Sequence, residues 1–135
     1  MSRNSPKRPR YPHSDVYVRL APSRLHGVGV IAVRDIPSGT AIFGDDDAPL
    51  RRVPVRAVRR APRELRRLYE DFCILRAGNY ICPRSFNDLT VSWYLNHSKS
   101  PNVACDAEFR FWASRRIRKG EELLTDYDEY SEPPE

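Results

Sequence analysis

The segment from Trp93 to Tyr127 constrains the fold of this chain more than any other stretch. It begins near a turn-forming run, Asn-His-Ser-Lys-Ser-Pro-Asn at 96–102, and it ends with Glu-Leu-Leu-Thr-Asp-Tyr at 122–127. Between these runs, residues 103–106 and 109–113 are rich in β-formers around Ala-Glu, which predicts an antiparallel pair of strands. Few folds need such a turn, a hairpin and an Asp-Tyr ending in that order.

Length and composition indicate one domain. A chain of 135 residues that is 40% hydrophobic can bury a single core and leave some irregular sequence outside it. No apolar run approaches the roughly 18 residues of a membrane span. The basic N-terminus has no apolar segment behind it, so it is not typical of a secretory signal. We expect a cytoplasmic or nuclear protein with a mobile basic arm at 1–14, a folded domain at 15–130 and a frayed tail at 131–135.

The local patterns predict a mainly β fold with short helices, in the α+β class, built from several small sheets. Strands are expected at 16–20, 28–33, 41–43, 80–82, 103–106, 109–113 and 122–126, with a helix at 62–73 and one or two helical turns within 89–95. The three adjacent aspartates at 45–47 lack the remaining ligands of a calcium loop, so a solvated loop is favoured.

Basic residues dominate the middle of the chain. Residues 51–67 carry eight arginines and a single acid, Glu64, in a chain whose net charge is +5. This Arg-rich insert, at about 51–75, either contacts phosphates or an acidic partner, or is a solvated face over one apolar stripe. No nucleic-acid-binding motif accompanies the charge.

Other site types find little support. Cys73, Cys82 and Cys105 contain no Cys-x-x-Cys pair, so we expect three small buried hydrophobes and no metal site. His26, His97 and Tyr127 could act as acids or bases, but neither a Gly-x-Ser-x-Gly elbow nor a His-Glu-x-x-His helix is present.

The ordered set of motifs resembles the SET domain of protein-lysine methyltransferases. Gly27-Val28-Gly29 is similar to the family's N-terminal Gly-x-Gly motif, residues 96–102 fit its Asn-His-Ser-x-x-Pro-Asn signature, and residues 122–127 match the Glu-Leu and Asp-Tyr ends of its last motif. The resemblance covers about residues 15–130. The family's Tyr-x-Gly motif has no clean counterpart, because Gly78-Asn79-Tyr80 holds those residue types in the wrong order.

The resemblance implies a C-terminal pseudoknot that brings the Asn-His-Ser and Asp-Tyr segments together, and it implies S-adenosylmethionine as the cofactor. By the same resemblance, the backbone of Gly27, Val28 and Gly29 would approach the cofactor, as would Asn96 and His97. Tyr127 would be the catalytic residue, placing its hydroxyl beside the transferring methyl group and the attacking amine. Tyr94 and Tyr130 are candidates for the wall of the lysine channel. No metal is required.

The implied activity is methyl transfer to the ε-amine of a lysine in a protein substrate, with histones and other basic proteins as candidates. By the same resemblance, a homodimer is a candidate assembly. One alternative is a SET fold that has lost activity and uses its Arg-rich face to bind an acidic partner or nucleic acid. A second is an unrelated basic nucleic-acid-binding protein, which charge alone supports.

Overall fold

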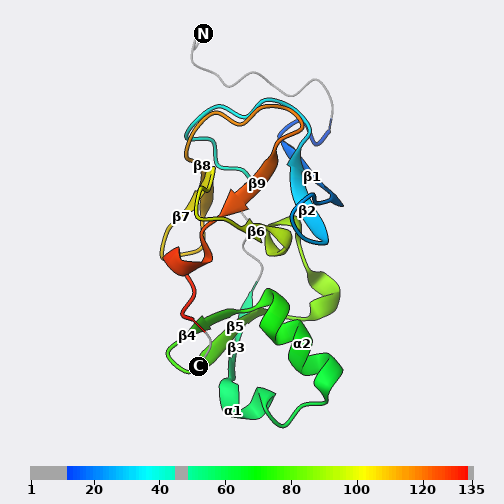
Figure 1. The fold of residues 1–135 in the computed structure, drawn as a ribbon, viewed down its shortest axis with the longest axis vertical. Helices are drawn as coiled ribbons and strands as arrows, with labels where there is room; N and C mark the ends of the chain where they lie inside the picture. Colours follow the sequence, from blue (N-terminus) through cyan, green and yellow to red (C-terminus); the bar gives the residue numbers. More distant parts are fainter. Residues whose placement is uncertain (1–11, 45–48, 134–135) are drawn as a thin grey trace.

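The computed structural model describes residues 12–44 and 49–133, which form two units (Figure 1). The core unit contains a six-stranded sheet in which β1, β2, β9, β7 and β8 follow one another and β6 pairs with β9. Its strands are β1 (Val18–Pro22), β2 (Val28–Ala32), β6 (Asn96–His97), β7 (Val103–Cys105), β8 (Phe111–Ala113) and β9 (Glu122–Thr125).

Strand β9 occupies the centre of the core unit. It pairs antiparallel with β2 and parallel with both β6 and β7. Strands on both sides satisfy its backbone, and Leu123 within it is fully buried. Residues 96–102 and 122–127 therefore lie side by side, as their resemblance to the family motifs predicts. The buried side chains around β9 form one hydrophobic cluster: Val18, Val30, Ala32, Ile36, Ile42, Leu95, Val103, Ala113, Ile117 and Leu123.

The second unit, here called the insert, comprises residues 50–83. Its sheet has the order β3 (Leu50–Pro54), β5 (Asn79–Pro83) and β4 (Ile74–Arg76), and it carries the helices α1 (Val55–Val58) and α2 (Arg63–Phe72). The β4–β5 hairpin turns through two residues with positive φ, Ala77 at 49° and Gly78 at 76°. Turns of this kind match the natural twist of a hairpin, and glycine adopts them without strain.

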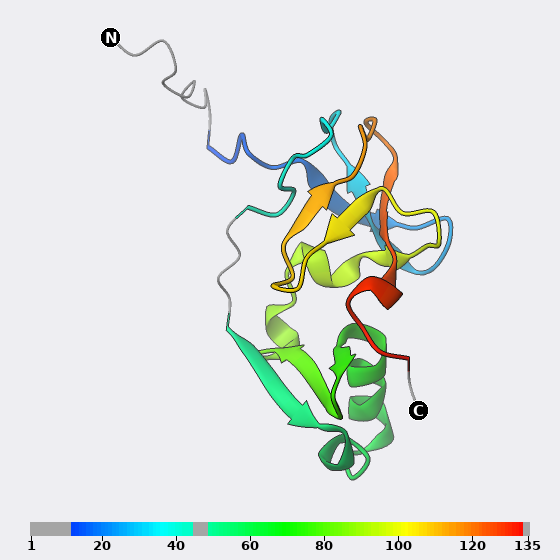
Figure 2. The same ribbon diagram turned by 90° about the vertical axis from the view of Figure 1, so that its left-hand side faces the viewer.

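Three short 3₁₀ segments border the junction of the two units, which Figure 2 shows from the side. They are η1 (Phe86–Asp88), η2 (Val91–Tyr94) and η3 (Tyr127–Glu129). Arg76 at the end of β4 ties the units together. Its Nε donates to the Tyr130 carbonyl at 2.9 Å, and its guanidinium lies 4.4 Å from the centre of the Phe109 ring.

The predicted fold class is confirmed: strands predominate, the helices are short and few, and the strands form several sheets. The helix predicted at 62–73 is α2, and the strand pair predicted after residue 102 is β7 and β8. Strand β1 lies two residues further along the chain than predicted. The reason is its pairing with β2, which runs from Val18 opposite Ala32 to Pro22 opposite Val28.

Three local expectations are corrected by the structure. Residues 41–43 form no strand, because Ala41 makes only an isolated bridge to Trp112 in β8. The insert is not only helical: β3 and β4 were not predicted from the sequence, and its fold extends to Pro83. The helical spacing of Leu65, Leu68, Tyr69 and Phe72 predicts one apolar stripe on α2, but Leu65 is 48% exposed.

The C-terminal tail is also more ordered than expected at its start. Ser131 and Glu132, which were expected to fray, bond to β4: Leu75 N–H donates to Ser131 Oγ at 3.1 Å, and Glu132 N–H donates to the Leu75 carbonyl at 2.7 Å. An open sheet edge offers such unpaired groups. Residues 1–11, 45–48 and 134–135, which include most of the predicted arm and the acidic loop, lie outside the described residues.

The cysteines are free thiols, as expected, but only Cys82 is fully buried, while Cys73 and Cys105 are half-buried. None of the helices in the described ranges combines the length and apolar character that crossing a bilayer requires.

Candidate active site

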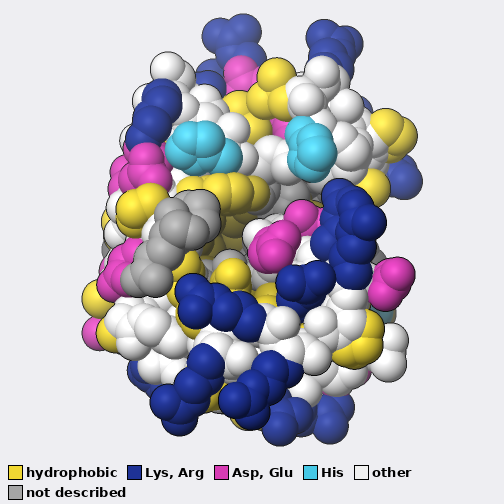
Figure 3. Space-filling model, turned by 60° about the horizontal axis from the view of Figure 1, so that its bottom comes forward, with side chains coloured by type: hydrophobic (Ala, Val, Ile, Leu, Met, Phe, Trp, Pro, Cys, Tyr) yellow, Lys and Arg dark blue, Asp and Glu magenta, His cyan; other side chains and the backbone are white. Residues whose placement is uncertain are grey.

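A cleft of about 1160 Å³ separates the core unit from the insert. This volume slightly exceeds the usual range of about 300–1,000 Å³ for ligand pockets. Figure 3 shows the hollow, with hydrophobic side chains inside it and acidic side chains at its side. Both units contribute aromatic residues to its lining: Phe72, Tyr80, Trp93, Phe111, Tyr127 and Tyr130.

Tyr127 reaches from η3 into this cleft with its hydroxyl end sheltered. The ring is 36% exposed toward the cleft, while the hydroxyl donates a hydrogen bond to the Leu95 carbonyl. Burial, with a smaller contribution from the negative charge of Glu122, raises the pKa of Tyr127 to about 12. At neutral pH the hydroxyl therefore remains protonated, which makes it an orienting group and a poor base.

His97 fixes the backbone of Tyr127. Its Nδ1 accepts the Tyr127 backbone N–H at 3.0 Å, although the two residues are 30 positions apart in sequence. The two rings lie 5.1 Å apart between centroids, and both line the cleft. The pairing of β6 with β9 makes this contact possible, since it places His97 opposite Thr125, two residues before Tyr127.

Tyr130 extends the aromatic wall beyond Tyr127. Its ring lies 6.0 Å from that of Tyr127 and 5.8 Å from that of Phe111, in edge-on arrangements that aromatic pairs favour. Burial raises the pKa of Tyr130 above its ordinary value, so this hydroxyl is also neutral at physiological pH.

Asn96 points away from His97, as alternation along a strand requires, and holds the loop that precedes β2. Its Nδ2 lies 3.1 Å from the His26 carbonyl, 3.2 Å from the Val28 carbonyl and 2.9 Å from Glu122 Oε2. Glu122 Oε1 in turn accepts a hydrogen bond from Ser23 Oγ at 2.7 Å. The side chains of Ser23, Asn96 and Glu122 thus form one network that fixes the shape of the loop.

This network explains the second glycine of the Gly-x-Gly motif. A Cβ built on Gly29 would lie 2.4 Å from Glu122 Oε2, and no real Cβ comes so close to another atom. Gly27 has a different role, because its φ of +50° places it in the left-handed region that side chains rarely adopt. The observed neighbour of Gly29 is therefore Glu122.

Asn102, the last residue of the 96–102 run, holds β9 in place. It is 3% exposed, its Nδ2 donates to the Glu122 carbonyl at 2.9 Å, and its Oδ1 accepts the Leu124 N–H at 2.8 Å. Its backbone N–H also donates to the Leu124 carbonyl at 3.1 Å. The role of this residue is structural, since it satisfies backbone groups of β9.

The comparisons with known proteins agree with this architecture. The family model for the SET domain matches residues 27–128, which is more than half of the chain. The chain belongs to the SET-domain family. Members of this family are protein-lysine methyltransferases.

Among solved structures, this SET domain is similar to a Plasmodium falciparum protein described as a candidate histone methyltransferase. The two share 21% sequence identity with a TM-score of 0.54, over 83% of this chain and 93% of the other. At this identity the likeness concerns the fold. No curated protein matched the chain.

Within the SET domain, the predicted site residues fall into two groups, one that lines the cleft and one that does not. His97, Tyr127 and Tyr130 line the cleft, whereas Gly27, Val28, Gly29 and Asn96 do not. Tyr94 is not part of the lining either; its ring packs 5.4 Å from that of Phe72, behind the cleft wall.

Two parts of the site were missed by sequence reasoning. Tyr80 in β5 lines the cleft, as Phe72 does. It supplies an aromatic group to the cleft although the family's Tyr-x-Gly motif has no clean counterpart in the sequence. The tyrosine of Gly78-Asn79-Tyr80 was visible as a signal, but its reversed order obscured it. Ser23 carried no signal, because only the fold brings it to Glu122, 99 residues away.

Proposed function

We propose that this SET domain transfers a methyl group from S-adenosylmethionine to the ε-amine of a lysine in a basic protein segment. The observation that carries this proposal is the position of Tyr127. Its hydroxyl is protonated and bound to the Leu95 carbonyl, and its backbone is held by His97 at the end of an aromatic cleft.

The residues of the site fit the cofactor. Within the described residues, Asn96 Oδ1 accepts no hydrogen bond, so it is available to a cofactor ammonium group beside Gly27 and Val28, which are exposed. The aromatic faces of Tyr127 and Tyr130 suit a positively charged methyl-bearing centre. S-adenosylmethionine, when bound, supplies an activated methyl group on a positively charged sulfur. Because Gly27, Val28, Gly29 and Asn96 do not line the cleft, the cofactor would approach Tyr127 from a different direction than a lysine in the cleft.

The chain's own residues would favour the neutral, nucleophilic amine. Free lysine has a pKa of about 10.4 and is almost fully protonated at neutral pH. An aromatic channel disfavours the ammonium form because it removes water from the charge. Tyr127 would orient the amine through its hydroxyl oxygen, and the hydroxyl proton stays on Tyr127 because its pKa is about 12. Most of the rate gain would come from this positioning.

The substrate class follows from the end of α2. Glu70 and Asp71 lie in its last turn and line the cleft. Carboxylates at a helix C-terminus oppose the helix dipole, so helix stability does not explain them. In the described part of the chain neither forms an ion pair, which leaves their charge for a cationic substrate. A segment with lysine or arginine next to the target lysine fits this rim.

The experiment combines titration calorimetry with a methyl-transfer assay on lysine peptides. S-adenosylmethionine should bind, and Asn96→Ala should weaken binding about tenfold, the cost of one hydrogen bond to a charged group. Tyr127→Phe should lower turnover by at least roughly 100-fold, the cost of losing a contact that positions the reacting amine, with little change in Kd. Tyr17→Phe is the control, because that ring lies 4.0 Å from the Arg34 guanidinium and outside the cleft.

Equal turnover of wild type and Tyr127→Phe would refute the role of the hydroxyl. Absence of cofactor binding, in a folded sample free of co-purified cofactor, would refute methyl transfer. It would favour a binding module that uses the same fold.

A further inference from the structure

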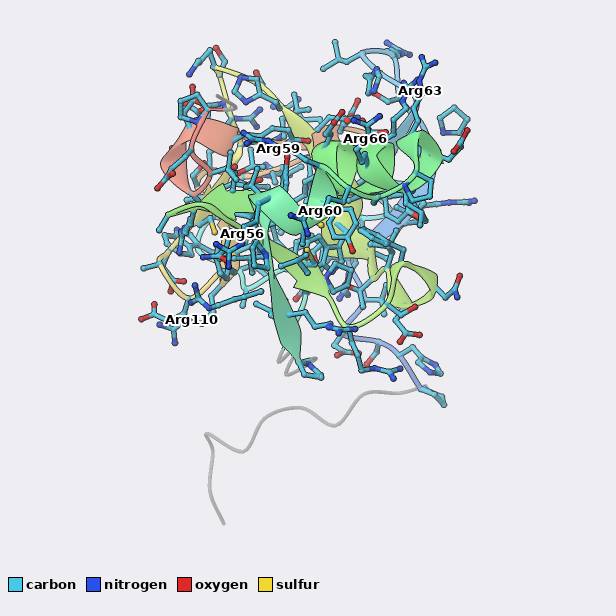
Figure 4. All side chains as sticks on the ribbon, turned by 90° about the horizontal axis from the view of Figure 1, so that it is seen from below. Arg56, Arg59, Arg60, Arg63, Arg66 and Arg110 are labelled. Atoms are coloured by element: carbon cyan, nitrogen blue, oxygen red, sulfur yellow. The ribbon has the colours of Figure 1, made fainter. Side chains whose placement is uncertain are left out.

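The arginines of the insert form a positively charged surface. Figure 4 shows it from below, with Arg56, Arg59, Arg60, Arg63 and Arg66 spread over α1, the α1–α2 connection and α2. These five residues are called the Arg face here, and Arg51, Arg52 and Arg67 add further positive charge within the same insert. In the described ranges, no ion pair engages Arg51, Arg52, Arg56, Arg60, Arg63 or Arg67.

Several arginines elsewhere in the molecule form ion pairs with nearby carboxylates. Arg116 pairs with Asp35 at 2.6 Å, Arg115 with Glu121 at 3.2 Å and Arg110 with Asp106 at 2.8 Å. Arg84 also pairs with Asp88. Both groups are exposed, so exposure alone does not explain the difference. In the described part of the chain, Arg19, Arg24 and Arg118 of the core unit also lack an ion pair, but they are scattered, whereas eight arginines fall within residues 51–67 of the insert.

Local stability does not explain the arrangement either. Arg63, Arg66 and Arg67 lie in the N-terminal half of α2, where positive charge opposes the helix dipole. Their i, i+3, i+4 spacing puts them on one side of the helix. Like charges so close repel each other and weaken the helix by a few tenths of a kcal/mol per pair, by general experience. An external anion would remove this repulsion.

We propose that the Arg face binds the phosphate backbone of double-stranded DNA without sequence preference. Arginine presents paired N–H donors that match phosphate oxygens, and repeated phosphates match a row of such donors. The proposal goes beyond methyl transfer and does not depend on it.

The chemistry of the face selects this partner. Residues 50–68 contain only arginine, apolar residues, proline and one glutamate. They include no Ser, Thr, Asn or Gln, the polar side chains that together with arginine read base edges or RNA 2′-hydroxyls. The exposed large hydrophobic residues of this region are Leu50 and Leu65, neither of them aromatic, so the face offers no platform for stacking single-stranded bases. What remains is recognition of backbone charge.

The test measures binding of a fluorescently labelled 20-base-pair DNA duplex by anisotropy across a salt series. The variant is Arg56→Gln/Arg60→Gln/Arg63→Gln. The matched control is Arg19→Gln/Arg118→Gln/Lys119→Gln, which removes the same charge from exposed side chains of the core unit. Circular dichroism and thermal unfolding establish that both variants fold.

Wild type should bind with a Kd in the micromolar range at low salt, with a steep salt dependence. The insert variant should bind at least roughly tenfold more weakly, and its log Kd–log salt slope should fall by about 2 to 3, since each neutralised phosphate contributes about 0.9. The control should change Kd by less than about threefold, because screening limits distant charges.

Three outcomes would overturn the proposal. Equal losses of DNA affinity in both triple variants would show that binding depends only on net charge. Tighter binding of single-stranded DNA or of an RNA duplex would refute the choice of partner. If poly-glutamate displaced the labelled duplex as well as unlabelled DNA of equal charge does, the partner of the Arg face would be an acidic protein.

Discussion

The core unit and the insert use the same β-hairpin elements but are stabilised in different ways. In the core unit, β9 is flanked on both sides, ten hydrophobic residues are buried in one cluster, and Asn102 satisfies backbone groups from within it. In the insert, α2 has no buried residue, and most of its charged residues lie where their charge opposes the helix dipole. The packing of the core unit therefore makes it rigid, which positions Tyr127. In the insert, local stability is lower because charged residues form two surfaces, the Arg face and the acidic rim of the cleft.

The largest effect is expected from Asn102→Ala in the core unit. It leaves the Glu122 carbonyl and the Leu124 N–H buried without partners, which should cost about 3 kcal/mol of unfolding free energy. Urea denaturation measures the loss. Asn87→Ala, at an exposed position, is the control and should change stability by less than about 0.5 kcal/mol. Similar values for both variants would show that β9 does not depend on this amide.

A smaller effect is expected from Arg76→Met at the junction. The change removes the bond to the Tyr130 carbonyl and the contact with the Phe109 ring, at a cost of about 2 kcal/mol. Hydrogen exchange should accelerate in the β4–β5 hairpin and not in β9. Arg19→Met, an exposed control in β1, should leave the unfolding free energy and the exchange rates of the hairpin unchanged. Faster exchange throughout the core unit would mean that the two units unfold as one.

One double substitution in the insert is expected to raise stability and to lower activity. Glu70→Gln/Asp71→Asn removes two carboxylates from the C-terminal turn of α2, which should raise stability by about 0.5 kcal/mol. The same variant should lower kcat/KM on a basic lysine peptide by roughly fivefold, the equivalent of about 1 kcal/mol.

The matched control is Glu64→Gln, at the opposite end of the same helix. It removes a carboxylate that favours the dipole, so it should lower stability slightly and leave kcat/KM unchanged. Loss of activity in this control, or higher activity in the double variant, would contradict the proposed acidic rim.

The smallest effect at neutral pH concerns the Tyr127 hydroxyl. Its pKa is raised from 10.0 to about 12 in the folded state, so the unfolded chain loses this proton first as pH rises. The associated stability is complete below pH 10 and is lost between about pH 10 and 12. The difference in unfolding free energy between wild type and Tyr127→Phe should be constant from pH 8 to 9.5 and should then shrink. A constant difference up to pH 11.5 would refute the raised pKa.

Most of the core unit could be predicted from the sequence. The runs at 96–102 and 122–127 carry enough specific residues to indicate the family, and β2, β7, β8 and β9 follow from β-formers between turns. The insert was predicted less well, because β3 is arginine-rich and β4 is only three residues long. Neither has the apolar pattern that indicates a strand, and their pairing with β5 depends on tertiary contacts.

The site divides in the same way. The residue types can be read directly from the sequence: a tyrosine at 127, an amide at 96, glycines at 27 and 29, and an excess of arginine at 51–67. Only the tertiary structure decided their partners. It places His97 on the Tyr127 backbone, Glu122 against Gly29 and Tyr80 in the cleft wall. The physical reason is that side-chain chemistry is local to each residue, whereas burial and hydrogen-bond partners depend on segments that only folding brings together.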